Sequence, residues 1–212
     1  LLARYPSIYD LMHNANLVAP TQYGRPVLGW QPRISRMVTS AAGKGWALLP
    51  ATAGVIDPMH STGIAHGLWG VWRVARFLLS GSLADRSEYG RTVAAELQWI
   101  DRLVAAAYRG MPHGMDLFAA AASFYFLAAI HSERRLAQQG QLPQGFLMHR
   151  DDQLQAAVNW FLQELGSAPQ SMERADRHRI ISAVRQRIAP WNDVGLLDPA
   201  LGNRIARAAA PK

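Results

Sequence analysis

The chain has no cysteine, no uninterrupted apolar run long enough to cross a membrane, and fewer acidic than basic residues. Without cysteine, neither disulfides nor thiolate metal ligands can hold the fold together. The most apolar segment, residues 115–130, is interrupted by Asp116 and Ser123 and is too short to span a bilayer. It therefore predicts a core helix, and we expect no membrane partner.

The shortage of acidic residues gives a formal charge of +7 over 212 residues. The excess lies at the two ends, with five Lys/Arg against one acid in residues 1–50 and eight against four in residues 173–212. No nucleic-acid reader motif and no alternation of basic with aromatic residues accompanies it, so nucleic-acid binding is not favoured. The seven histidines share no ligand spacing, and no metal site is expected.

The first residues also lack the layout of a signal peptide. The chain does not begin with methionine, and we expect it to start part-way through a longer protein. A cytoplasmic location is the expectation that follows from the missing leader.

Apolar residues spaced three and four apart predict five helices in the second part of the chain. They run from Gly63 to Gly81 and over about 91–108, 115–139, 152–165 and 172–188. The apolar face of the first helix is formed by Ile64, Leu68, Val71, Trp72, Ala75, Leu78 and Leu79. Arg73 and Arg76 fall on its other side, and Glu96 and Asp101 of the second helix are expected on exposed faces.

Shorter elements are predicted before and after these helices. They are a helix within residues 1–19, two short strands within 27–38, a buried strand at 46–49, a small-residue loop at 51–54, an extended tail after 188 and a last helical turn near 199–208. The fold class is thus mainly α, a helical bundle with a few short strands. We divide it into a mixed segment, residues 1–62, and a helical domain, residues 63–212.

The residues between these two parts form the most informative motif of the chain, GWALLPATAGVIDPMHSTGI over residues 45–64. A short strand and a glycine-containing loop lead directly into the start of a helix. Unpaired backbone N–H groups and the positive end of the helix dipole converge at such a point. The motif therefore predicts a seat for a phosphate, a flavin ring or another anion.

This stretch resembles the second flavin motif of the flavin-dependent halogenases, which belong to the hydroxybenzoate hydroxylase type of flavin monooxygenases. The segments Arg4-Tyr5-Pro6-Ser7 and Pro190-Trp191-Asn192 are also similar to a halogenase-like branch of that family. The resemblance implies that the chain is the C-terminal portion of an α+β flavin monooxygenase fold. Residues 1–62 then form the end of its FAD-binding and substrate sheet region, with the flavin-seat loop.

The resemblance implies FAD as the cofactor of the intact enzyme. The residues that it assigns to the cofactor are Asp57, Pro58, Ser61, Thr62, Gly63 and Ile64. Asp57 would accept a hydrogen bond from the ribityl chain, and Gly63 would let the backbone approach the ring closely. Thr62 and Gly63 would also bind the halide. The implied partners are a small-molecule substrate, a halide ion and a flavin reductase that supplies reduced FAD.

Two departures from the family pattern matter. Tryptophan halogenases have Glu where this chain has Asp57, and another Glu immediately before Ser-Thr-Gly, where this chain has His60. His60 is the one catalytic candidate within the motif, and its presence in place of Glu argues against an ordinary tryptophan halogenase. The dinucleotide glycine motif, the Trp-x-Trp-x-x-Pro segment and the catalytic lysine of the family are absent from this chain, so we expect the chain alone to be inactive.

Simpler interpretations remain open for each of these residues. Asp57 is also suited to bracing the turn before Pro58, and Ser61 and Thr62 to capping a helix. For the protein as a whole, the alternatives are a flavin hydroxylase or reductase without halide chemistry, and a non-catalytic helical module that binds an acidic partner through its basic last helix.

Overall fold

The computed structural model describes residues 21–22, 25–26, 35–140, 145–169 and 171–201. The chain divides into two compact units, residues 1–33 and residues 34–212. In the first unit, β1 (Thr21–Gln22) pairs antiparallel with β2 (Arg25–Pro26). The helix predicted within residues 1–19 lies outside the described residues.

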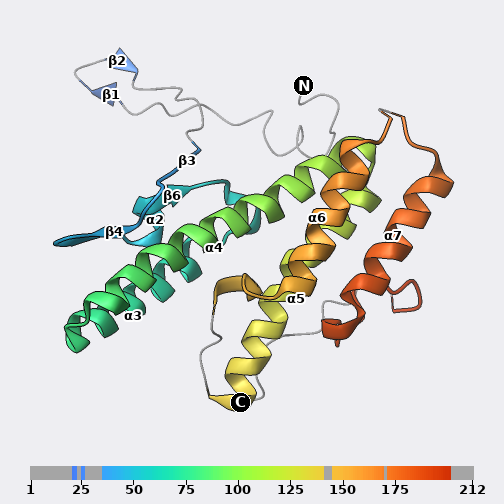
Figure 1. The fold of residues 1–212 in the computed structure, drawn as a ribbon. Coiled ribbons are helices and arrows are strands. Elements are labelled where there is room, and N and C mark those ends of the chain that lie inside the picture. Colours follow the sequence, from blue (N-terminus) through green and yellow to red (C-terminus); the bar gives the residue numbers. More distant parts are fainter. Residues whose placement is uncertain (1–20, 23–24, 27–34, 141–144, 170, 202–212) are drawn as a thin grey trace. The chain divides into compact units, whose positions relative to one another are not determined.

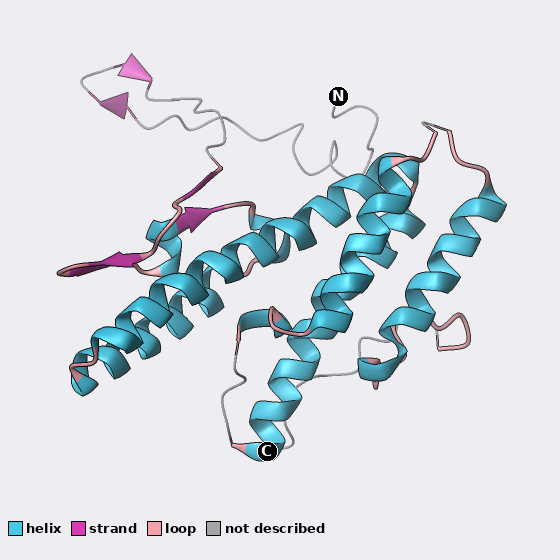
Figure 2. Ribbon diagram, viewed as in Figure 1, coloured by secondary structure: helices cyan, strands magenta, loops and turns pink. Residues whose placement is uncertain are grey.

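The second unit is built mainly from helices, as Figures 1 and 2 show. The long ones are α3 (Gly63–Ser80), α4 (Leu83–Gly110), α5 (Met115–Gln139), α6 (Asp152–Gly166) and α7 (Arg174–Ile188). The prediction of a mainly helical fold with a few short strands is confirmed at this level. Three of the predicted helices begin and end within two residues of α5, α6 and α7.

The main core lies where α4, α5, α6 and α7 pack together. Trp99, Phe124 and Phe161 are its largest fully buried side chains, and the Trp99 indole donates a hydrogen bond of 2.7 Å to the Leu147 carbonyl. By length and composition alone α5 could cross a membrane, but a core helix passes the same test. The buried residues along α5, such as Leu117 and Phe124, confirm the predicted core helix.

The strands of the second unit are two residues long and form separate pairs. β3 (Arg36–Met37) pairs with β6 (Gly54–Val55), and β4 (Ala42–Gly43) pairs with β5 (Trp46–Ala47). The prediction of a buried strand at 46–49 is wrong, because Trp46 is 47% exposed and the strand ends at Ala47. The predicted loop is a short helix, α2 (Pro50–Ala53), which begins at a proline, a residue suited to the first helical position.

The helix α4 begins about two turns before the predicted start at Arg91. Ser82 caps it, because its hydroxyl accepts a 3.1 Å hydrogen bond from the Asp85 N–H. The preceding residue, Gly81, ends α3 in the left-handed conformation, with φ of 65°. A tight hairpin therefore joins α3 to α4, and the two helices lie side by side (Figure 1).

The apolar face of α3 is exposed, although such a face normally points into the core. Ile64 is 81% exposed and Leu79 is 90% exposed, and Leu68, Val71, Trp72 and Leu78 are exposed as well. The buried side instead carries His66, Gly70 and Phe77, and the Arg73 side chain is only 13% exposed. Arg73 does fall on the side opposite the apolar residues, and that side is the one that packs against the rest of the unit.

Residues 35–62 belong to the same compact unit as the helices. The contact-based boundary lies between Arg33 and Ile34, whereas the sequence suggested a division after residue 62. A second, smaller apolar cluster explains the difference, since Ala41 and Ala53 pack there against Phe77 of α3. The α4 members of this cluster are Tyr89, Val93 and Leu97.

Candidate functional site

A cavity of about 500 Å³ lies between the segment that precedes α3 and the helices α3 and α4. Most of its lining comes from residues 50–64, and the rest from His66, Leu97 and Ile100. Every residue that the resemblance assigns to the cofactor lines it, namely Asp57, Pro58, Ser61, Thr62, Gly63 and Ile64. The size falls within the range of small-molecule sites, and the walls are predominantly apolar.

The start of α3 opens on this cavity. Thr62 occupies the N-cap position, but its side chain makes no capping hydrogen bond. The first N–H groups of a helix have no partner within the helix, so here they depend on groups outside it. Ser61 precedes them with φ of 51°, which ends the 3₁₀ helix η2 (Pro58–His60) and turns the chain into α3.

Asp57 braces the turn before Pro58. One carboxylate oxygen accepts a 2.7 Å hydrogen bond from the Met59 N–H, and the other accepts a 2.8 Å hydrogen bond from the Tyr108 hydroxyl of α4. The bracing role suggested by the sequence is therefore present, and the role toward a ribityl chain stays a prediction. These bonds fix the position of Asp57 on the cavity wall.

His60 lies outside the lining of the cavity. Its ring stacks on Tyr125 of α5, with centroids 4.3 Å apart, and its Nε2 is buried without a partner among the described residues. Burial lowers the pKa of His60, and a hydrogen bond with the Leu103 backbone partly opposes this. His60 is thus a packing residue between η2 and the helices, and its catalytic role remains untested.

A buried charged cluster, which we call the Glu96 cluster, adjoins the cavity and shares His66 with its lining. Its centre is the carboxylate of Glu96, which has no exposed surface. Arg73 donates two hydrogen bonds to it, of 2.6 and 2.7 Å, and His66 Nε2 lies 3.0 Å from the Oε2 atom. The Phe146 N–H donates a 2.7 Å hydrogen bond to Oε1, and His149 Nδ1 lies 3.5 Å from that atom.

This cluster corrects the expectation that Glu96 lies on an exposed face. Burial alone would raise the pKa of Glu96, but hydrogen bonds from His66 and Arg73 and the charge of Arg73 lower it to about 2. The carboxylate is therefore charged at neutral pH. The pKa of the His149 imidazole is lowered, and burial is the largest cause.

These shifts predict a loss of stability in acid. His60 and His149 have pKa values below those of the unfolded chain, so unfolding takes up protons once the pH falls below about 6.5. Glu96 adds a second loss of stability, which occurs as the pH falls from the ordinary glutamate pKa of 4.5 to the folded-state pKa of about 2. The lowered pKa of Glu96 corresponds to about 3 kcal/mol.

Urea unfolding at pH 7, 5 and 3 measures this dependence. We expect the free energy of unfolding to fall at each step toward acid, and Glu96→Gln to show a much smaller fall below pH 4.5. Equal stability of the wild-type chain at pH 7 and pH 3 would contradict the assigned charge of Glu96.

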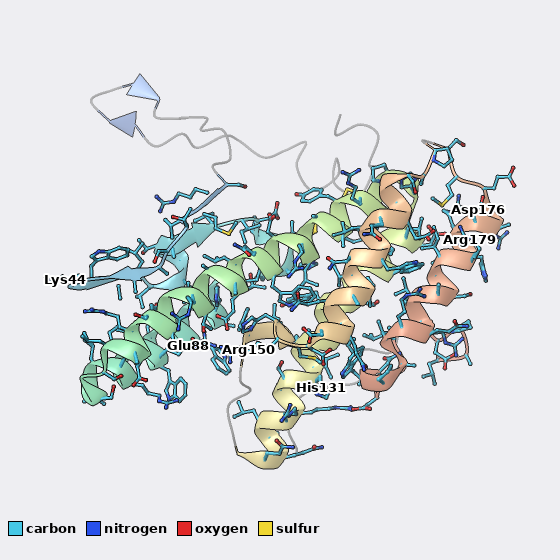
Figure 3. All side chains as sticks on the ribbon, viewed as in Figure 1. Lys44, Glu88, His131, Arg150, Asp176 and Arg179 are labelled. Carbon is cyan, nitrogen blue, oxygen red and sulfur yellow. The ribbon has the colours of Figure 1, made fainter. Side chains whose placement is uncertain are left out.

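The basic residues of α7 are largely paired within the unit. Arg179 lies near Glu164 and Asp176, Arg177 bonds to Asp116, and the Arg187 guanidinium lies 3.7 Å from the ring centroid of Trp160. Figure 3 shows Asp176 and Arg179 on the same helix, and Glu88 of α4 beside Arg150. These pairs reduce the positive charge that α7 offers to an acidic partner.

In the part of the chain that the structure describes, no group of three or more His, Asp or Glu side chains is placed to hold a metal ion. Comparison of the chain with protein-family models, with curated proteins and with solved structures finds no match. The functional interpretation therefore depends on the cavity, its lining and the Glu96 cluster.

Proposed function

We propose that the chain is the C-terminal part of an FAD-dependent oxidoreductase of the halogenase-like type, and that the cavity before α3 seats the isoalloxazine ring. One observation carries this proposal. The residues that the flavin motif assigns to the cofactor all line a single cavity of about 500 Å³, which is large enough for a fused planar ring system.

The chemistry of the lining fits such a ring. Its walls are mainly apolar, while the start of α3 offers backbone N–H groups with no side-chain cap. Thr62 and Gly63 would direct these groups at a ring carbonyl oxygen or at a halide. A Cβ atom added at Gly63 would meet nothing within 4 Å, so the backbone there is open to a ligand.

Asp57 would take the ribityl side of the ligand, held in place by its bonds to Met59 and Tyr108. Bound flavin would supply the reaction with oxygen, and the protein would position it and exclude water. The alternative of a hydroxylase or reductase without halide chemistry uses the same seat. Product formation by the intact enzyme that requires bromide would favour the halogenase, and bromide-independent oxidation would favour the alternative.

The exposed face of α3 supports a place in a larger flavoprotein. Apolar surface of this extent is normally covered. The exposed apolar face of α3 begins at Ile64, which also lines the cavity. This apolar surface is therefore continuous with the proposed flavin seat.

Riboflavin is the appropriate probe for the chain of 212 residues. It has the ring and the ribityl chain but needs no adenosine or pyrophosphate site. We expect weak, saturable binding, measured by quenching of riboflavin fluorescence. Gly63→Phe should weaken this binding at least about tenfold, because the new ring would occupy the cavity.

Gly67→Phe is the matched control. Gly67 is one turn further along α3, has nothing within 4 Å of an added Cβ, and does not line the cavity. The Gly67→Phe variant should bind riboflavin as tightly as the wild-type chain does. The proposal fails if the wild-type chain does not bind riboflavin, or if both variants bind it equally.

A further inference from the structure

His66 joins the cavity to the Glu96 cluster. It lies one turn into α3 and lines the cavity, yet only 4% of its side chain is exposed. Among the described residues that line the cavity, only His66 and Asp57 are titratable, and both oxygens of Asp57 accept structural hydrogen bonds. His66 is therefore the nitrogen base at this wall.

Glu96 fixes the protonation pattern of this imidazole. An ionised carboxylate only accepts hydrogen bonds, so the His66 Nε2 atom, 3.0 Å from Oε2, must carry the hydrogen. The lone pair of the neutral ring is then on Nδ1. The ring is also held in place by stacking on Phe146, with centroids 4.8 Å apart. A base oriented by a carboxylate is the arrangement that general acid–base chemistry requires.

Charged and polar groups from three elements surround His66 and the Glu96 carboxylate. The groups that face the cluster are Arg73 from α3, Glu96 from α4, and His149 and the Phe146 N–H from the segment around the 3₁₀ helix η4 (Phe146–Met148). Among the described partners of Glu96, Arg73 is the one that is always charged. Protonation of His66 would place a second positive charge against the same carboxylate, which remains ionised far below neutral pH.

We propose that His66 exchanges a proton with a planar aromatic ligand in the cavity, and that Glu96 is the residue that positions it. The ligand class is an aromatic ring with one acidic O–H or N–H group. In the forward step the ligand's O–H or N–H bond breaks, its electron pair stays on the ligand, and the proton binds His66 Nδ1. The inference rests on the proposed function in one respect, that the cavity takes an aromatic ring.

A coloured phenol tests this directly. Neutral 4-nitrophenol and its anion absorb at different wavelengths, so the spectrum reports the proton's position without any turnover. Bound to the wild-type chain, the probe should show a pKa at least about one unit below its value in water, which is a tenfold change in the ratio of ionised to neutral probe. His66→Gln should bind the probe and return this pKa to the solution value.

His60→Gln is the control, because His60 is a buried histidine next to the cavity that does not line it. It should keep the shifted spectrum. The inference is overturned if 4-nitrophenol does not bind, if its pKa is unshifted, or if His60→Gln rather than His66→Gln abolishes the shift.

A second measurement does not depend on the folding of a variant. Nitrogen-15 NMR of the wild-type imidazoles should show His66 with hydrogen on Nε2 alone, and on both nitrogens when 4-nitrophenol is bound. In folded Glu96→Gln the preference for Nε2–H should be lost, which a purely structural role of Glu96 would not require. An unchanged His66 spectrum with probe bound would overturn the inference.

The two proposals can fail separately. Riboflavin binding without a His66-dependent shift of the phenol would remove the proton-transfer role and leave the flavin seat. A His66-dependent shift without riboflavin binding would remove the flavin seat and leave the acid–base site.

Discussion

Replacing Glu96 by alanine is expected to destabilise the chain by about 3–5 kcal/mol, the usual cost of breaking a buried ion pair from one side. The Arg73 guanidinium would lose both of its hydrogen bonds to the carboxylate, and its side chain is only 13% exposed. The Phe146 N–H would also lose its acceptor. One side chain thus connects α3, α4 and the segment before α6, and its loss should loosen all three.

Glu88→Ala is the matched control for this prediction, since it removes the same side chain two turns earlier on α4. Glu88 is also paired, with Arg91 and Arg150, but its side chain is 52% exposed (Figure 3). Exposed ion pairs contribute at most about 1 kcal/mol to the free energy of unfolding. Urea unfolding followed by circular dichroism compares the two. Similar losses in Glu96→Ala and Glu88→Ala would show that burial of the Glu96 cluster adds nothing.

The helices could largely be predicted from the sequence, because their signals are local. The run from Met115 to Gln139 is apolar at helical spacing and is followed by Gly140, which ends α5 with φ of 61°. Gly81 ends α3 in the same way. The start of α4 was missed because Ser82 and Asp85 form a cap before the apolar pattern begins.

The buried side of α3 could not be deduced from periodicity alone. The helix carries two stripes, the apolar one that begins at Ile64 and a second one at His66, Gly70, Arg73 and Phe77. The second stripe has the same helical spacing, and it is the one that packs. Its polar members are buried only because Glu96, far along the chain, supplies the opposite charge. Such a pairing is tertiary and leaves no local signal.

The candidate site was predictable only where its residues are close in sequence. Asp57 and Gly63 are close in sequence, and the short 3₁₀ helix η2 between them brings both to one cavity. Nothing local in the sequence favours His66 over His60, since the partner of His66, Glu96, is 30 residues away. The useful signal was a histidine and an arginine seven residues apart on one helix face, with a glycine between them.

That glycine gives the second large prediction. A Cβ atom at Gly70 would lie 2.6 Å from Pro50 Cγ and nearer still to Cδ. The proline ring is buried and fixed to the backbone at the start of α2, so it cannot rotate away as a flexible side chain would. Gly70→Ala should therefore cost about 1–3 kcal/mol, the usual range for overpacking. Because Pro50 lines the cavity, riboflavin binding should weaken as well.

Gly67→Ala separates this steric effect from the general preference of helices for alanine. Both glycines are interior to α3, but an added Cβ at Gly67 meets nothing within 4 Å. Alanine there should stabilise the chain by about 0.5–1 kcal/mol, the ordinary gain over glycine in a helix. Thermal and urea unfolding of the two variants should thus give changes of opposite sign. If Gly70→Ala also stabilises the chain, α3 does not approach Pro50 as closely as the structure places it. The cavity wall to which Pro50 belongs would then have a different position.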